Sequence, residues 1–211
     1  MKTDHFPTKY WHRFDDDRIQ CDVCPHYCKV REGQHGLCFI RMCHEGKIVL
    51  TSYGRSTGFA IDPVEKKPLN HFLPGVPVLS FGTAGCNLAC KFCQNWDISK
   101  ARVSDIISKK ASPKQIAATA QKMQCPAVAF TYNEPIIFLE YAIDTAKECH
   151  KLGIKTIAVT NGYISEQARE EFFTHMDAAK VDLKGFSEEF YAKITGSHLQ
   201  PVLNNLIYLK K

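Results

Sequence analysis

The chain has 211 residues, 45% of them hydrophobic, which is enough for one well-packed core and a small additional module. Its formal net charge of +5 is modest and its basic residues are scattered, so nucleic-acid binding is not expected. No apolar run reaches the length of a membrane span and no hydrophobic signal region follows the first residues, so we expect a cytoplasmic protein without a membrane partner.

The N-terminal part, residues 1–75, is predicted to be a cysteine-rich metal-binding module. Ten cysteines in a chain without a secretion signal favour metal ligation over disulfides. A CxxC pair and two further cysteines form one candidate ligand set: Cys21, Cys24, Cys28 and Cys38. Four thiolates suit tetrahedral zinc and equally an auxiliary iron-sulfur cluster. Free thiols are less favoured, because so small a segment needs a metal or another cross-link to stabilise its fold. His26 and His35 are substitute ligands, and Cys43 is surplus.

The remaining residues, 76–211, are predicted to form the core domain. The apolar run at 76–81 reads as a buried strand, and Gly82 and Gly85 then permit a tight turn. A CxxxCxxC loop follows, with Cys86, Cys90 and Cys93. Three thiolates on one short loop suit a four-iron cluster with one iron left open, which another molecule completes. A zinc site or reduced core thiols are the alternatives, but zinc usually takes four ligands.

After the cysteine loop, strand and helix patterns alternate in the manner of repeated βα units. Strands are expected at 127–131, 155–160 and 179–183, and helices after Ser112, Pro135, Ser165 and Ser187. With the strand at 76–81, these elements make four units of an α/β fold. Cys125 and Cys149 are expected to be core thiols. The chain ends at 203–211 inside a helical apolar pattern without a capping glycine, so we expect it to be a fragment.

Polar segments follow three of these strands, at the carboxyl ends where ligand sites gather in βα barrels. They are Thr131-Tyr132-Asn133-Glu134-Pro135, Thr160-Asn161-Gly162 and Asp182-Leu183-Lys184. Each segment also has an ordinary interpretation. Glu134 suits the first turn of a helix, and Asn161 with Gly162 is a common turn dipeptide. Asp182 and Lys184 suit a surface ion pair.

The motifs of the cysteine loop resemble those of a known family. The CxxxCxxC spacing, with Phe92 directly before its last cysteine, resembles the signature of radical SAM enzymes. The segments 65–72, 82–88 and 93–96 resemble the radical SAM member of the AmmeMemoRadiSam three-protein system, which is similar to pyruvate formate-lyase activating enzymes. The resemblance implies a partial (βα)6 radical SAM barrel, truncated after about four βα units, with a small N-terminal cysteine-rich module.

The same resemblance implies the reaction and its cofactors. Cys86, Cys90 and Cys93 would hold a [4Fe-4S] cluster, and S-adenosylmethionine (SAM) would complete the coordination of the open iron. The reduced cluster would cleave SAM to methionine and a 5′-deoxyadenosyl radical, which abstracts hydrogen from a substrate. The chain is thus expected to be a radical SAM oxidoreductase, and no side chain is assigned a catalytic role.

The resemblance also assigns residues to SAM binding. They are Phe92, Asn133, Glu134, Thr160, Asn161, Asp182 and Lys184. The segment Tyr132-Asn133-Glu134-Pro135 resembles the GGEP motif that holds the SAM amino group. Tyr132 and Asn133 replace glycines there, and glycine reaches the required backbone conformations more easily. Val159 stands where related enzymes have an aspartate that helps to bind a monovalent cation, so no cation site is expected.

Three further expectations concern residues near this site. Trp96 is expected to cover the cysteine loop, where a large aromatic side chain would exclude water. His71 is a weak candidate for the mouth of the active site. Lys66 and Lys67 are expected to be solvated charges.

The resemblance implies an electron donor such as flavodoxin or ferredoxin. Two kinds of radical acceptor stay open: a glycine of a partner glycyl-radical enzyme, or a small molecule or macromolecule handled together with the two companion proteins of the three-protein system. Another class of function also stays open, namely a truncated, inactive iron-sulfur or metal-binding protein, or an electron-transfer module. The sequence does not separate these alternatives.

Overall fold

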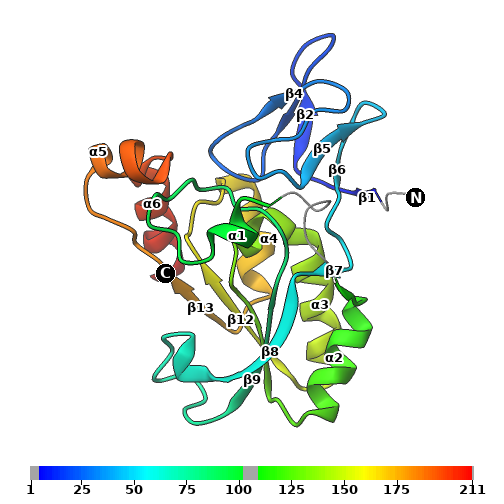
Figure 1. Cartoon of the computed structure of the whole chain (residues 1–211), viewed down its shortest axis with the longest axis vertical. Coiled ribbons are helices and arrows are strands. Elements are labelled where there is room, and N and C mark those ends of the chain that lie inside the picture. Colours follow the sequence, from blue (N-terminus) through cyan, green and yellow to red (C-terminus); the bar gives the residue numbers. More distant parts are fainter. Residues whose placement is uncertain (1–4, 102–108, 211) are drawn as a thin grey trace.

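The core of the protein is a five-stranded sheet in the order β13-β12-β11-β9-β8 (Figure 1). The structure is a computed structural model, and it describes residues 5–101 and 109–210. The strands are β8 (Gly58–Pro63), β9 (Pro77–Gly82), β11 (Ala127–Phe130), β12 (Lys155–Thr160) and β13 (Ala178–Val181). β9, β11, β12 and β13 are parallel, whereas β8 runs antiparallel to β9. The four predicted parallel strands and their α/β class are confirmed.

β8 is a strand that the sequence patterns did not predict. It pairs with β9 along its whole length, from Gly58 opposite Gly82 to Pro63 opposite Pro77. A glycine, an aspartate and a proline within six residues weaken the strand signal, and an edge strand is where a proline is tolerated. The core sheet therefore takes one strand from the segment predicted as the N-terminal module, and it reaches back to residue 58.

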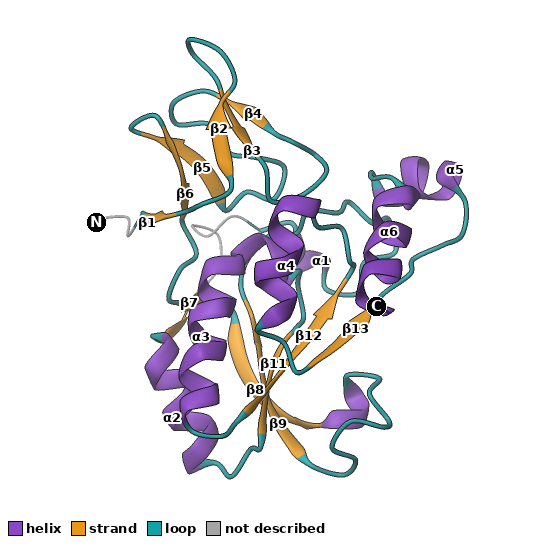
Figure 2. Cartoon of the chain, turned by 180° about the vertical axis from the view of Figure 1, so that it is seen from behind, coloured by secondary structure: helices purple, strands orange, loops and turns teal. Residues whose placement is uncertain are grey.

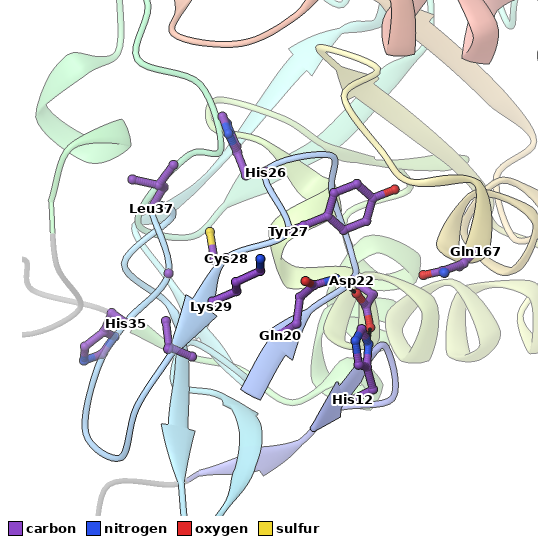
Figure 3. A pocket seen from close by; sticks show the side chains of 12 residues that line it. His12, Gln20, Asp22, His26, Tyr27, Cys28, Lys29, His35, Leu37 and Gln167 are labelled. Atoms are coloured by element: carbon purple, nitrogen blue, oxygen red, sulfur yellow. Dashed lines mark hydrogen bonds and ion pairs between the residues drawn. The ribbon is translucent and has the colours of Figure 1, made fainter. Parts of the chain in front are cut away.

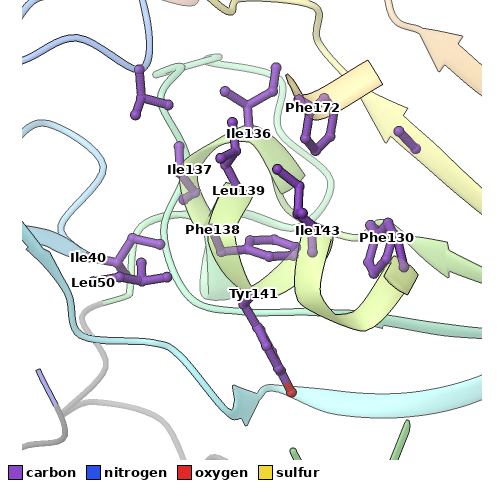
Figure 4. Close-up of a cluster of buried hydrophobic side chains, with 14 of the residues drawn as sticks. Ile40, Leu50, Phe130, Ile136, Ile137, Phe138, Leu139, Tyr141, Ile143 and Phe172 are labelled. Atoms are coloured by element: carbon purple, nitrogen blue, oxygen red, sulfur yellow. The ribbon is translucent and has the colours of Figure 1, made fainter. Parts of the chain in front are cut away.

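Three amphipathic helices cover one face of the sheet (Figure 2). They are α2 (Pro113–Lys122), α3 (Leu139–Lys151, entered through the 3-10 turn η3, Pro135–Phe138) and α4 (Glu166–Thr174). The predicted cap of α2 is confirmed, because the Ser112 hydroxyl accepts from the Gln115 amide and the Gln115 side chain accepts from the Ser112 amide. These helices bury a cluster of aromatic and aliphatic side chains, including Phe130, Phe138 and Tyr141 (Figure 4).

The opposite face of the sheet is covered by the segment 64–76, which begins with the 3-10 turn η1 (Val64–Lys66). Val64, Leu69 and Phe72 pack there against Val78, Ala129 and Ile157. Parallel strands are normally buried on both faces, and this segment provides the second layer.

The N-terminal module consists of two small antiparallel sheets of order β1-β6-β5 and β2-β3-β4 (Figure 1). Their strands are β1 (Phe6–Pro7), β2 (Trp11–Arg13), β3 (Ile19–Cys21), β4 (Lys29–Val30), β5 (Arg41–His44) and β6 (Lys47–Leu50), and a separate pair joins β7 (Arg55–Ser56) to β10 (Lys109–Lys110). The module packs on the core, since Ile40 and Leu50 belong to the same buried cluster as Ile137 and Phe138 (Figure 4).

After β13 the chain forms α5 (Glu188–Phe190), a single π-helical turn η4 (Tyr191–Thr195) and α6 (Leu199–Lys210). α6 packs against the turn after β12, because the buried Asn205 amide donates to the carbonyl oxygens of Gly162 and Ile164 at 2.9 and 2.8 Å. Helices were predicted after Ser187 and at the end of the chain, and both are present. None of the helices in the described ranges combines the length and apolarity needed to cross a lipid bilayer.

Candidate active site at the carboxyl ends of the parallel strands

A cavity of about 640 Å³ lies at the carboxyl ends of the four parallel strands, within the size range of small-molecule sites. The loops that follow β9, β11, β12 and β13 line it. Ten residues predicted for the cluster and for SAM are among those that line this cavity: Cys86, Cys90, Phe92, Cys93, Asn133, Glu134, Thr160, Asn161, Asp182 and Lys184. Segments separated by almost one hundred residues in the sequence therefore meet at one site.

The three cysteines of the loop after β9 offer a thiol donor set at one wall of the cavity. Burial raises the pKa of the Cys86 thiol to about 12, and the nearby Glu134 carboxyl adds to this. Burial also raises the pKa of Cys90, with the Lys184 ammonium opposing it. Coordination to a metal deprotonates such thiols. Within the described residues no three His, Cys, Asp or Glu side chains converge on a single ion, but each cysteine of a four-iron cluster binds a different iron. Three thiols on one wall of the cavity therefore suit a four-iron cluster that leaves one iron without a protein ligand.

Two glycines let the cysteine loop approach neighbouring backbone. At Gly82 an added Cβ would lie 2.3 Å from the Thr131 carbonyl oxygen, and at Gly85 (φ +82°) it would lie 2.1 Å from the Cys38 carbonyl oxygen. The sequence predicted these glycines as a tight turn around a bulky cluster. The structure shows another reason for glycine at these two positions. A side chain would collide with the loop after β11 at Gly82 and with the N-terminal module at Gly85.

The cysteine loop is also held by backbone hydrogen bonds to the π-helical turn η4. The Ala89 amide donates to the Thr195 carbonyl oxygen at 2.7 Å, and the Lys91 amide donates to that of Ile194 at 3.0 Å. The Lys100 ammonium donates to the carbonyl oxygen of Leu88 at 3.1 Å. The loop is thus fixed by hydrogen bonds to the segment after β13 and to Lys100.

Asn133 is buried and binds the start of the cysteine loop. Its Oδ1 accepts from the Thr83 amide at 3.0 Å, and its Nδ2 donates to the Thr83 hydroxyl and to the carbonyl oxygens of Ala84 and Gly85 at 2.9–3.2 Å. The residue was assigned to SAM through the motif it occupies. Its side chain lines the cavity but its hydrogen bonds go to the loop, so its visible role is to position Thr83, Ala84 and Gly85.

Tyr132 adopts the left-handed backbone conformation that its motif demands, with φ +72°. Its hydroxyl donates to Asp62 at 2.8 Å, and its ring lies 4.9 Å from the Lys67 ammonium. These contacts compensate for a conformation that a non-glycine residue rarely adopts. The backbone strain expected at this position is therefore present, and contacts with Asp62 and Lys67 hold the Tyr132 side chain in place.

Asp62, Lys66 and Lys67 form a charged cluster at this site that the sequence analysis missed. Both ammonium groups lie 2.7 Å from the buried Asp62 carboxylate, and Lys67 is 3% exposed rather than solvated as expected. Burial alone would raise the pKa of Asp62, but hydrogen bonds from Lys66, Lys67 and Tyr132 hold it well below its usual range. The sequence did not mark Asp62 as a site residue, because it lies on strand β8, which was not predicted.

Glu134 joins the ends of β11 and β12. Its carboxyl accepts from the Thr160 hydroxyl at 2.6 Å, from the Asn161 amide at 2.7 Å and from the Ile136 amide at 3.1 Å. Burial raises its pKa to about 7, although these three donors favour the charged form. The Asn161 side chain continues the network by donating to Asn87 at 2.8 Å, directly after the first cysteine of the loop.

Asp182 and Lys184 form an ion pair at the end of β13, with 2.6 Å between the ammonium and the carboxylate. Lys180 pairs with the same carboxylate. The Lys184 side chain is 24% exposed and lines the cavity, where its charge acts to lower the pKa of both Cys90 and Glu134. Phe92 is half exposed and lies against Phe190, with 6.0 Å between ring centroids.

Two neighbouring residues lie differently from what the sequence suggested. Trp96 begins the short helix α1 (Trp96–Ser99) and is 67% exposed, so it does not cover the cysteine loop. His71 is exposed in the segment that covers the far face of the sheet.

The N-terminal cysteines form a separate group. Cys21, Cys24, Cys28 and Cys38 line a buried cavity of about 20 Å³. His26 also lines it, but its Nε2 is 2.7 Å from the Asn87 carbonyl oxygen. His35 lies in a neighbouring open groove, where His12 and Asp22 pair at 2.7 Å (Figure 3). Cys43, Cys125 and Cys149 are buried free thiols elsewhere.

Known proteins with similar sequences share this chain's central region. A model of the radical SAM superfamily matches residues 81–211. An uncharacterized protein of Methanocaldococcus jannaschii is 35% identical over 202 residues, which are 96% of this chain and 60% of that protein. The pyruvate formate-lyase-activating enzyme of Clostridium pasteurianum is 29% identical over 125 residues, 58% of this chain and 52% of the enzyme. The 4-hydroxyphenylacetate decarboxylase activating enzyme of Clostridium scatologenes is 29% identical over 84 residues, 40% of this chain and 27% of the enzyme.

The chain therefore spans 60% or less of the length of each of these relatives. The superfamily model covers more than half of the chain and includes the three-cysteine loop and the cavity-lining loops after β9, β11, β12 and β13. This chain belongs to the radical SAM superfamily.

Proposed function

We propose that this chain binds a [4Fe-4S] cluster through Cys86, Cys90 and Cys93 and cleaves SAM reductively to abstract hydrogen from a substrate. Membership of the superfamily implies the cluster and SAM. The observation that carries the assignment of residues is the single 640 Å³ cavity, where the three cysteines and the polar ends of β11, β12 and β13 meet. When bound, the reduced cluster supplies the electron that cleaves SAM.

The residues of this chain would hold SAM by complementary charge. Lys184 lines the cavity, and its ammonium, which is paired with Asp182, suits a second carboxylate, while the buried Glu134 carboxyl suits an amino group. Thr160 and Asn161 keep Glu134 in place. Phe92, half exposed on the cavity wall, offers an apolar surface for an adenine ring.

We propose further that the four βα units form part of a (βα)6 barrel, that the protein acts in the cytoplasm, and that its electron donor is a flavodoxin or ferredoxin. The similarity to two activating enzymes supports a partner protein as the radical acceptor, with a glycine as the site of hydrogen abstraction. The motifs around the cysteine loop favour the radical SAM member of the AmmeMemoRadiSam system. A glycyl radical formed on a partner would be detected by electron paramagnetic resonance.

The first test is SAM cleavage after anaerobic reconstitution with iron and sulfide. With dithionite as reductant, we expect the wild type and Cys125→Ala to release 5′-deoxyadenosine and Cys90→Ala to release none. Cys125 is a buried thiol outside the cavity, so it controls for the loss of a cysteine as such. Failure of the wild-type chain to assemble a four-iron cluster would contradict the proposal.

A second function, a cluster-binding or electron-transfer protein that does not cleave SAM, would need only the three thiols of Cys86, Cys90 and Cys93 at the cavity. The same experiment separates the two. A four-iron absorbance spectrum that bleaches with dithionite but yields no 5′-deoxyadenosine would support this alternative.

Lys184→Ala tests the binding of SAM separately from cluster assembly. We expect a normal iron content and a Kd for SAM that is roughly 10- to 100-fold higher, because a hydrogen bond to a charged group contributes about 1.5–3 kcal/mol. Lys193→Ala is the control, since Lys193 pairs with Glu189 on the exposed surface. Isothermal titration calorimetry of the reconstituted proteins with SAM measures the difference in Kd. Equal affinities in both variants would show that Lys184 does not bind SAM.

A further inference from the structure

We propose that Cys21, Cys24, Cys28 and Cys38 bind one Zn²⁺ ion. All four side chains line the same buried cavity, and all four are free thiols. They come from the end of β3, the turn after it and the loop before β5, so the site joins both small sheets of the N-terminal module. The inference does not rest on the proposed SAM chemistry.

The backbone already brings these segments together. The Cys21 amide donates to the Cys28 carbonyl oxygen at 2.9 Å, which places the first and third cysteines side by side. Between them the Tyr27 amide donates to the Cys24 carbonyl oxygen at 3.1 Å and closes a tight turn. At Gly36 an added Cβ would lie 3.4 Å from the Cys28 sulfur, so the loop that carries Cys38 packs on Cys28.

The size of the cavity favours one of the two metal centres that the sequence left open. About 20 Å³ is room for one atom or one water molecule. A cluster also contains inorganic sulfide and several irons, and the cavity at the three-cysteine loop is about 640 Å³ by comparison. Tetrahedral coordination by four thiolates is the usual closed geometry of structural zinc.

One cation lies on the wall of this cavity. Arg41 lines it and is 2% exposed, and its guanidinium is shared with the Glu140 carboxylate. Four thiolates and one Zn²⁺ carry two net negative charges, which burial disfavours without a nearby positive charge. The guanidinium offsets part of that charge.

The four sulfurs must move inwards to bind. Within the described residues no three such side chains stand close enough to share an ion, so binding would rotate the cysteines toward the small space between them. Cys28 also lines the open groove of Figure 3, which gives the ion a route from solvent.

The test uses the full chain with Cys86→Ala, Cys90→Ala and Cys93→Ala combined, so that the other cysteine site is removed. After anaerobic purification, we expect one zinc per chain and no inorganic sulfide. X-ray absorption at the zinc edge is expected to give four sulfur ligands at about 2.3 Å. Adding Cys24→Ala and Cys38→Ala should abolish the zinc, whereas adding Cys125→Ala and Cys149→Ala should retain it.

A second measurement does not depend on whether the Cys24→Ala and Cys38→Ala variant folds. In the parent triple variant, replacement of zinc by Co²⁺ should give the absorption of a tetrahedral tetrathiolate site. Iron with stoichiometric sulfide in the parent would overturn the inference in favour of an auxiliary cluster. No bound metal, or zinc with nitrogen or oxygen ligands, would also overturn it.

Discussion

The side chain of Asn133 ties the end of β11 to the loop that carries Cys86, Cys90 and Cys93. It accepts one hydrogen bond and donates to three acceptors in Thr83, Ala84 and Gly85, all in a buried environment. Glycine in its place could not make these bonds. The resemblance linked this motif position to SAM, but its side chain supports the cysteine loop. Loss of the side chain should therefore reduce cluster assembly first, and SAM binding only as a consequence.

Asn133→Ala is therefore expected to lower the free energy of unfolding by about 2 kcal/mol, because the Thr83 amide and two carbonyl groups lose their buried partner. Reconstitution should also incorporate less iron per chain. Urea unfolding and iron analysis measure the two effects. Asn95→Ala is the matched control, since the exposed Asn95 amide makes one hydrogen bond to the Tyr132 carbonyl oxygen, and we expect a change within about 0.5 kcal/mol. Equal losses in both variants would contradict the assigned role.

At the level of strands and helices, the sequence predicted the parts with strong local signals. Apolar runs gave β9, β11 and β12 within a residue or two, and Ser112 marked the start of α2. β8 was missed because its glycine, aspartate and proline are typical of loops, and its strand conformation depends on pairing with β9. A helix was predicted after Ser187, but not that it continues as the π-helical turn η4, because the contacts of that turn with Ala89 and Lys91 are far away in the sequence.

The stability of the junction between β12 and β13 is expected to depend on pH because of the Asp177 carboxyl. Its carboxylate accepts from Lys155, the Thr156 amide and His150 at 2.8–2.9 Å. Burial acts to raise the pKa of Asp177, but these donors lower it from 3.8 to about 2. A carboxyl with a lowered pKa stabilises the fold above its ordinary pKa, and this contribution is lost as the pH falls through the folded-state value.

Asp177→Asn should consequently lower the Tm at pH 5, by roughly 2–4 °C for each 1 kcal/mol lost in a chain of this size. The gap between wild type and variant should close as the pH falls from about 4 towards about 2. Thermal unfolding of the cluster-free chain followed by circular dichroism measures this. The exposed Asp16 provides the control variant Asp16→Asn, and a gap that stays constant with pH would contradict the prediction.

Across the whole molecule, the N-terminal module packs directly against the three-cysteine loop of the candidate site. His26 contacts the Asn87 carbonyl oxygen, and Gly85 packs on the Cys38 carbonyl oxygen, so both cysteine loops touch. The sequence predicted each loop from its own spacing. Their contact was not predictable, because it depends on how two modules with no shared pattern pack together. In the Asp62 cluster the ion pairs are local in the sequence, and only the hydrogen bond from the distant Tyr132 depends on how the chain folds.

The buried ion pair between Arg41 and Glu140 joins the module to α3. The Arg41 guanidinium donates to both Glu140 carboxylate oxygens, at 2.5 and 3.2 Å, and to the Ile137 carbonyl oxygen at 2.8 Å. The two side chains are 2% and 7% exposed. Removing one partner leaves a buried charge without compensation, which costs roughly 3–5 kcal/mol, whereas replacing both by apolar side chains of similar volume is often close to neutral.

Arg41→Met is accordingly expected to lower the free energy of unfolding by roughly 3–5 kcal/mol, and the double variant Arg41→Met with Glu140→Leu should recover most of that loss. Urea unfolding of the wild type, both single variants and the double variant completes the cycle. If the double variant proved as unstable as Arg41→Met alone, the ion pair itself would be the source of the stability. Recovery would instead mean that shape and apolar contact between β5 and α3 hold the module on the core, and that the charges chiefly fix which side chains meet.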